Sequence, residues 1–212
     1  MVWYDSSSPV ESRKGKQQVR VIAGTAKGRP LKAVPGNNTR PTTDKVKEAV
    51  FSMIGPYFDG GRVLDLFAGT GGLGIEALSR GMEQAVFIDM ERLSIEVIKQ
   101  NVQAAGLTQQ AEIYRNEAGR AIKVLEKRGE RFALIFLDPP YRMKEMDAMM
   151  VELADRGLLE EGARVVVEHD ADHVYPEQFG SYIQLKHARY GDIAVTVYRY
   201  EPGAGEPQTE EH

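Results

Sequence analysis

The most specific chemical signal in the chain is Asp138-Pro139-Pro140-Tyr141, which follows the apolar run at residues 133–137. An aromatic amine is a poor nucleophile because its lone pair is delocalised into the ring. Two acceptors that bind its hydrogens, here the Asp138 carboxylate and the Pro139 carbonyl, draw that lone pair out of conjugation. Prolines stiffen the turn, and Tyr141 offers a flat face to a flipped base. These four residue types suit a loop that holds the amine of a base for alkylation. The alternative, a rigid loop without chemistry whose tyrosine belongs to the core, is not excluded by the sequence.

A glycine-rich loop precedes this motif at residues 65–74, DLFAGTGGLG. Its glycines match the dinucleotide fingerprint, and Asp89 ends the next predicted strand, where a ribose-binding acid belongs. This pattern fits NAD and S-adenosylmethionine equally. Asp65 favours S-adenosylmethionine, because a carboxylate there would repel a pyrophosphate but suits an ammonium and a sulfonium. A loop-bracing role for Asp65 and a solvated strand end for Asp89 remain open.

Further cofactor contacts are expected in the glycine loop and at the ends of the next two strands. Asn116 and Glu117 can reach an adenine, although a helix N-cap explains them equally well. The three histidines at 169, 173 and 187 have no recognisable metal spacing with the carboxylates, so no metal site is expected. The predicted cofactor set beside Asp65 and Asp89 is Phe67, Ala68, Gly69, Thr70, Gly71, Gly74, Met90, Asn116 and Glu117.

The elements that must position these residues alternate strand and helix after Gly60-Gly61. Five such repeats predict an α/β fold with a doubly wound, mainly parallel sheet, and the last two segments predict an antiparallel C-terminal hairpin. The carboxyl ends of parallel strands share one edge, which brings the two loops together. The expected strands are residues 62–66, 84–89, 111–115, 132–138 and 164–168, the helices 73–80, 91–105, 117–127 and 144–156, and the hairpin 183–189 with 193–200.

A small N-terminal extension precedes the sheet. Residues 19–23 and 31–34 predict a short β-hairpin, and a helix is expected to start at Thr43 or Asp44. This assigns residues 19–59 to an extension and 60–200 to the main domain. Residues 1–18 and 201–212 are polar and predict disordered ends.

Composition and charge narrow the class of protein. The 212 residues include no cysteine, which excludes thiolate metal sites and a cysteine nucleophile, and no apolar run reaches the length of a membrane span. We expect a cytoplasmic protein. The net charge is −4, yet residues 1–50 hold ten Lys and Arg against four Asp and Glu. This excess of positive charge is what a segment that binds nucleic-acid phosphates would have, and a solvated N-terminus without a partner explains it equally well.

These motifs resemble amino-directed methyltransferases and, more closely, the bacterial RsmD family. The discriminating stretch is residues 40–48, RPTTDKVKE, together with residues 20–24, the glycine loop and the Asp138 motif. The resemblance implies a Rossmann-like class I methyltransferase fold, S-adenosylmethionine as cofactor, and methylation of guanine N2 in 16S rRNA, free or in a small-subunit particle. It also implies an RNA-facing N-terminal segment, with contacts at Arg40, Thr42, Thr43 and Lys47. Arg20 and Lys45, two further cations of this segment, are expected to join them. A capped surface helix explains any one of these residues equally well.

Three alternatives compete with this interpretation. The same chemistry can act on adenine N6 of DNA or RNA, or on a protein glutamine. An NAD-dependent oxidoreductase explains the glycine loop but leaves Pro139-Pro140 unexplained. A non-enzymatic RNA-binding module would not need Asp138 and Tyr141.

Overall fold

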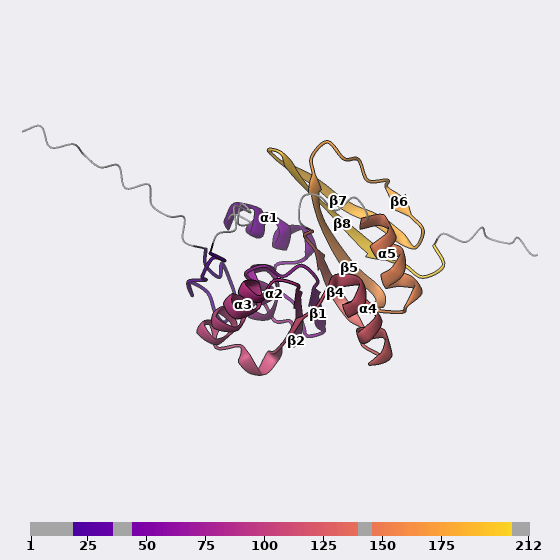
Figure 1. The fold of residues 1–212 in the computed structure, drawn as a ribbon. Coiled ribbons are helices and arrows are strands. Elements are labelled where there is room, and N and C mark those ends of the chain that lie inside the picture. The colour runs from indigo at the N-terminus through magenta and orange to yellow at the C-terminus, as the bar shows by residue number, and fades with distance from the viewer. Residues whose placement is uncertain (1–18, 36–43, 140–145, 205–212) are drawn as a thin grey trace, which may run out of the picture.

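The computed structural model describes residues 19–35, 44–139 and 146–204. Their centre is an eight-stranded sheet of order β3-β2-β1-β4-β5-β8-β7-β6. The first five strands run parallel, and the last three add an antiparallel edge (Figure 1). This arrangement confirms the predicted α/β sheet and its C-terminal hairpin. The strands are β1 (Arg62–Asp65), β2 (Gln84–Asp89), β3 (Ala111–Arg115), β4 (Phe132–Leu137), β5 (Leu159–Asp170), β6 (Gln178–Phe179), β7 (Tyr182–Tyr190) and β8 (Ile193–Tyr200).

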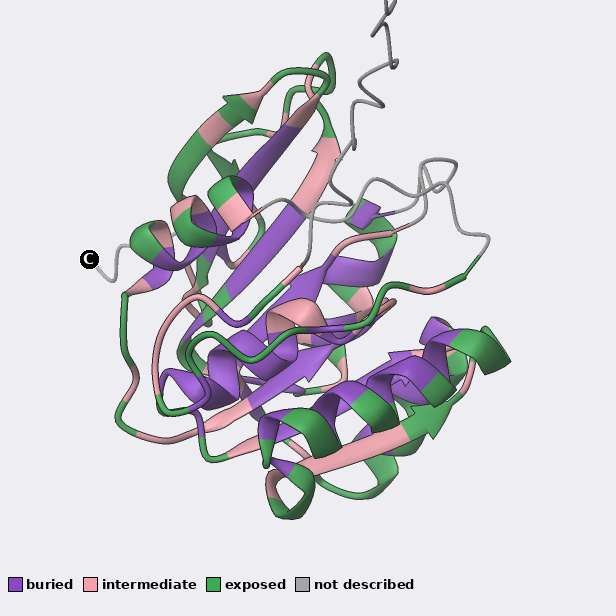
Figure 2. Ribbon diagram, turned by 90° about the vertical axis from the view of Figure 1, so that its left-hand side faces the viewer, coloured by how far each residue is buried: buried purple, intermediate pink, exposed green. Residues whose placement is uncertain are grey.

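Helices cover both faces of the sheet. One face packs against α1 (Asp44–Ile54), α2 (Gly72–Ser79) and α3 (Arg92–Ala105), and the other against α4 (Ala118–Lys127) and α5 (Met146–Asp155). Successive strand residues enter opposite cores, so Val63 faces the first set and Leu64 the second. Figure 2 shows the buried residues gathered on the strands and on the helix surfaces turned toward them. Among the described helices, none is long and apolar enough to cross a membrane.

Strand β5 is longer than the sequence predicted. It starts at Leu159 rather than at residue 164, and its register against β4 shifts between Phe132 and Leu134. Gly162, with φ of +77°, lies in the extra stretch between the two registers. The polar residues before it interrupt the apolar pattern, which explains why a shorter strand was expected. The two-residue β6 was also not predicted.

The N-terminal segment forms a minimal version of the predicted hairpin. Its two arms share one isolated antiparallel bridge, Arg20 with Pro30, flanked by hydrogen bonds from the Val21 amide to the Arg29 carbonyl and from the Leu31 amide to the Val19 carbonyl, but they form no regular strands. The turn between them instead bonds to α2: the Thr25 amide donates to the Ser79 carbonyl at 2.8 Å. A side chain at Gly24 would place its Cβ 1.7 Å from that carbonyl oxygen. The segment therefore docks on α2 through its backbone, which leaves few groups free for a ladder.

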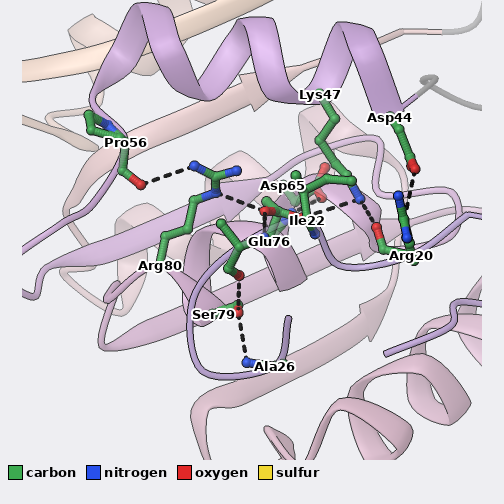
Figure 3. A network of polar contacts seen from close by, with 12 residues as sticks. Arg20, Ile22, Ala26, Asp44, Lys47, Pro56, Asp65, Glu76, Ser79 and Arg80 are labelled. Carbon is green, nitrogen blue, oxygen red and sulfur yellow. Dashed lines mark hydrogen bonds and ion pairs between the residues drawn. The ribbon is translucent and has the colours of Figure 1, made fainter. Parts of the chain in front are cut away.

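A buried ion network secures this docking (Figure 3). The Glu76 carboxylate of α2 is fully buried and accepts from Arg80 Nε at 2.8 Å, while Lys47 Nζ of α1 lies 3.3 Å from it. The backbone amides of Ile22 and Ala23 donate to the same carboxylate at 2.8 and 2.9 Å. One carboxylate thus joins α1, α2 and the N-terminal segment, and its charge is fully compensated.

The two cations of this network have further partners. Lys47 Nζ donates to the Arg20 carbonyl at 2.5 Å. The Arg80 guanidinium donates to the Pro56 carbonyl at 3.1 Å and lies over the Phe51 ring, 4.6 Å from its centroid. Removing the central anion would therefore leave two cations held among apolar side chains.

We predict that Glu76→Gln lowers the free energy of unfolding by about 3–5 kcal/mol, because it leaves buried positive charge uncompensated. Urea unfolding of the full chain measures the loss. The control is Glu96→Gln, which breaks the exposed pair with Arg92 and should cost less than about 1 kcal/mol. Equal costs for the two variants would contradict the central role of Glu76.

Candidate active site

Four acidic side chains follow one another along the carboxyl edge of the parallel strands. Asp89 ends β2, Asp65 ends β1, Asp138 directly follows β4, and Glu168 lies near the end of β5. These strands are neighbours in the order β2-β1-β4-β5. The sequence predicted the three aspartates as site residues and missed Glu168, although it placed that residue at a strand end. The edge therefore gathers acidic side chains from four consecutive strands.

Asp89 holds the glycine loop in place. Its Oδ2 accepts from the Gly69 amide at 2.8 Å, and its Oδ1 accepts from the Glu91 amide at the start of α3, also at 2.8 Å. The Thr70 carbonyl of the same loop accepts from Asn101 of α3 at 2.9 Å. The loop between β1 and α2 is thus fixed from β2 and α3, with Gly69 and Gly71 at φ of +54° and +76°.

Asp65 lies beneath the same loop. It is 2% exposed, and its Oδ2 accepts from the Gly74 amide at 3.0 Å, so the loop-bracing role left open by the sequence is present. Gly74 must lack a side chain, since a Cβ would lie 2.4 Å from the Phe87 ring. Burial raises the pKa of Asp65 to about 7; the Gly74 hydrogen bond opposes the shift, and Asp138 and Asp89 add to it.

Asp138 faces a small cavity of about 10 Å³. The walls are apolar side chains of α1, α2, β4, β5 and β8, with Glu168 as the second acid in the lining. Burial raises the pKa of Asp138 to about 6. Pro139 follows within the described part of the chain, whereas Pro140 and Tyr141 lie outside the described residues. Asp138 is thus a half-buried acid set directly beside the glycine-loop strand.

The residues after β3 form a helix cap. The Glu117 carboxylate accepts from the Gly119 and Arg120 amides at 2.9 and 3.2 Å at the start of α4. Asn116 Oδ1 accepts from the Glu117 amide at 2.9 Å. After β2, Met90 is 60% exposed, and its carbonyl accepts from Arg115. The capping role that the sequence left open for Asn116-Glu117 is present, and an additional contact with adenine stays a prediction.

Comparisons with known proteins agree with this geometry. A family model described as "Conserved hypothetical protein 95" matches residues 19–199. "Ribosomal RNA small subunit methyltransferase D" of Escherichia coli K12 is 30% identical over 190 residues, which cover 90% of this chain and 94% of that protein. The chain belongs to the RsmD family. "Putative rRNA methyltransferase YlbH" of Bacillus subtilis is 50% identical over 181 residues, which are 85% of this chain and 98% of that relative.

A solved structure of a similar protein shares the fold. The structure titled "Putative methyltransferase yhhF from Escherichia coli" has a TM-score of 0.73 and 32% identity, and the match covers 87% of this chain and 98% of that one. The predicted Rossmann-like methyltransferase fold is therefore confirmed.

The RsmD resemblance implies an RNA-facing N-terminal segment. The structure agrees with this expectation for the exposure of two residues and contradicts it for Lys47. Arg20 and Lys45 are exposed, with Arg20 Nε 3.2 Å from Asp44 at the start of α1. Lys47 is only 1% exposed and pairs with Glu76, so its expected RNA-facing position is wrong. The reason is tertiary: Lys47 is needed to compensate a buried carboxylate. Arg40, Thr42 and Thr43 lie outside the described residues.

The histidines noted in the sequence take structural positions. His169 Nε2 and His187 Nδ1 both hydrogen-bond the buried Thr196 hydroxyl, at 2.8 and 2.9 Å. His173 packs against Tyr175 with ring centroids 4.5 Å apart. Within the described ranges, no three His, Asp or Glu side chains are grouped to hold a metal ion.

We predict that Asp65→Asn stabilises the fold at pH 8 by up to about 4 kcal/mol. The folded-state pKa of about 7 lies above the ordinary 3.8, so the wild type loses stability as the pH rises from about 4 to about 7. The amide removes this loss and can still accept from Gly74. Urea unfolding at pH 5 and pH 8 tests it, with the exposed Asp59→Asn as control. A lower stability of Asp65→Asn at pH 8 would refute the assignment.

Proposed function

We propose that the chain transfers a methyl group from S-adenosylmethionine to the N2 amine of a guanine in 16S rRNA. The observation that carries this proposal is the acidic row at the strand ends, with Asp138 beside a glycine loop that Asp65 and Asp89 brace. Membership of the RsmD family supports the reaction class. The name of the Escherichia coli relative, a small-subunit RNA methyltransferase, supports the substrate class.

The chemistry of the donor set fits S-adenosylmethionine. Its ammonium and sulfonium are positive, and they suit an edge with four acids beside a glycine loop whose backbone can come close to a ligand. A pyrophosphate would meet the buried Asp65 carboxyl beneath the same loop, which disfavours NAD. The bound cofactor would supply an activated methyl group. The residues proposed to hold it are Asp65, Phe67, Ala68, Gly69, Thr70, Gly71, Gly74, Asp89, Met90, Asn116 and Glu117.

Asp138 and Pro139 are proposed to orient the target amine. With its pKa near 6, Asp138 is an anion at neutral pH and accepts a hydrogen from the amine. The Pro139 carbonyl would accept the second, and Pro140 and Tyr141 would stiffen the turn and stack on the flipped base. The alignment localises the nitrogen lone pair toward the methyl carbon. The residues contribute mainly position and charge stabilisation.

The N-terminal residues 19–59 are proposed to face the RNA, and residues 60–200 to form the methyltransferase domain. Arg20 and Lys45 are exposed cations on this segment, and Arg40, Thr42 and Thr43 are further proposed contacts. The Glu76 network fixes the segment on α2, the helix that starts at the glycine loop. RNA bound there would lie next to the proposed site. The substrate, free or in a small-subunit particle, places the reaction in the cytoplasm.

The proposal is tested by incubating the full chain with labelled S-adenosylmethionine and unmodified small-subunit rRNA, free and in assembled particles. We expect labelled N2-methylguanosine in the nucleoside digest. Methyladenosine would move the target to another base, and labelled protein or DNA alone would refute the RNA substrate.

Asp138→Ala should lower the methyl-transfer rate by two orders of magnitude or more, since removing one aligned acceptor costs on the order of 3 kcal/mol. Cofactor affinity measured by calorimetry should change little, because the glycine loop keeps its own braces. The control is Asp192→Ala in the exposed β7–β8 turn. A rate for Asp138→Ala within a few-fold of wild type would eliminate its catalytic role.

A further inference from the structure

Glu168 lies beside Asp138 in the sheet. Strands β4 and β5 are parallel with Leu137 opposite Val167, so the next residue on each chain is Asp138 and Glu168. Matched residues of neighbouring parallel strands project from the same face. Both side chains accordingly line the same small cavity. Two carboxyl groups therefore meet in one apolar pocket at the end of the sheet.

The fold gives no structural reason for this second acid. Throughout the described ranges, the Glu168 carboxyl has no hydrogen bond or ion pair that would compensate its burial. The rest of the cavity wall is apolar: Val50 of α1, Leu73 of α2, and Val166 and Val195 of the sheet. A half-buried, unpaired acid costs stability, and replacing it by an apolar residue would remove that cost. Its position next to Asp138 suggests a functional reason instead.

We propose that Glu168 is a positioning residue whose carboxylic acid donates a hydrogen bond to one Asp138 oxygen and directs the other oxygen toward the target amine. This inference rests on the proposed function. Burial, together with the charge of Asp138, raises the pKa of Glu168 to about 8, while that of Asp138 is about 6. Between these values the pair holds one proton, which is the state that the hydrogen bond requires.

The pair can also accept the proton that the target amine must lose during methylation. The amine lone pair forms the bond to the methyl carbon, the carbon–sulfur bond breaks, and its electron pair stays on sulfur. The methylated nitrogen is then positively charged and must lose one proton. The Asp138 carboxylate accepts it, and the proton passes to solvent before the next turnover. No oxidant or further reactant is needed.

The groups packed around the pair show which of them ionises near pH 8. Asp65 of β1 is the next acid along the edge and interacts with Asp138. Lys47 of α1 is committed to Glu76, and α2 and β8 present Leu73 and Val195. The neighbouring His169 points to the opposite face, where it bonds Thr196. Among the described groups, the ionisation near pH 8 therefore belongs to the Asp138–Glu168 pair, whereas Asp65, with a pKa of about 7, ionises at lower pH.

The test is the ratio of variant to wild-type methylation rates from pH 6.5 to pH 9, since a ratio cancels any titration of the RNA. Glu168→Gln keeps a neutral donor, so its rate should lie within a few-fold of wild type at pH 7. The ratio should rise roughly tenfold by pH 9, because one unit above its pKa only about a tenth of a carboxyl stays protonated. Glu168→Leu lacks the donor, and its kcat should fall about tenfold at pH 7 with KM unchanged.

The control is Glu161→Gln, an exposed acid on the same strand, whose ratio should stay near one at every pH. Unfolding curves of each variant exclude a folding defect. A flat ratio for Glu168→Gln, or equal rates for Glu168→Gln and Glu168→Leu at pH 7, would overturn the positioning role while leaving the proposed function intact. Absence of RNA methylation by the wild-type chain would overturn both.

Discussion

The buried Glu76 carboxylate is the interaction on which the rest of the molecule depends. A charge without solvent must be compensated, and Glu76 takes its partners from Lys47, Arg80 and the backbone of the N-terminal segment. The same helix begins at the glycine loop, and α1 contributes Val50 to the pocket of Asp138. One compensated anion in the core thus ties together the helix that follows the glycine loop, the helix that lines the pocket of Asp138, and the segment proposed to meet RNA.

The acidic edge follows the opposite principle, since within the described residues none of its four acids forms an ion pair. Asp65, Asp138 and Glu168 all have raised pKa values because burial disfavours their anions. A fold selected for stability alone would avoid such a row. At Asp65, next to the glycine loop, a positively charged cofactor would relieve this cost, so part of the stability lost in the free protein would become cofactor affinity. The proposed function uses the same row: Asp138, with a pKa near 6, lies beside Glu168, with a pKa near 8, and an ionised Asp138 would direct the amine.

The pattern of apolar and polar residues along the sequence is sufficient to predict the site residues that lie at strand ends. Apolar runs that are followed by acids and glycines predict strands, and they place Asp65, Asp89 and Asp138 at the carboxyl edge of the sheet from the sequence alone. Lys47 was misplaced although a signal existed: it precedes Phe51 and Ile54 by four and seven residues, on the buried face of α1. Its partner Glu76 is distant in sequence, and spacing along one helix does not reveal such a pair. Glu168 was missed for the same reason. Only the pairing of β5 with β4 places it beside Asp138, and that pairing cannot be read from the residues around Glu168.

The most direct test of the account is calorimetry of S-adenosylmethionine binding at pH 6.5 in two buffers that differ in ionisation enthalpy. At this pH the ligand's ammonium is already protonated, whereas an acid with a pKa near 7 is mostly neutral. If the cofactor's positive charge lies beside Asp65, binding must lower the pKa of that carboxyl and release protons, and Asp65→Asn must release fewer. Equal heats in the two buffers, meaning no proton release, would contradict the claim that this edge holds the cationic cofactor.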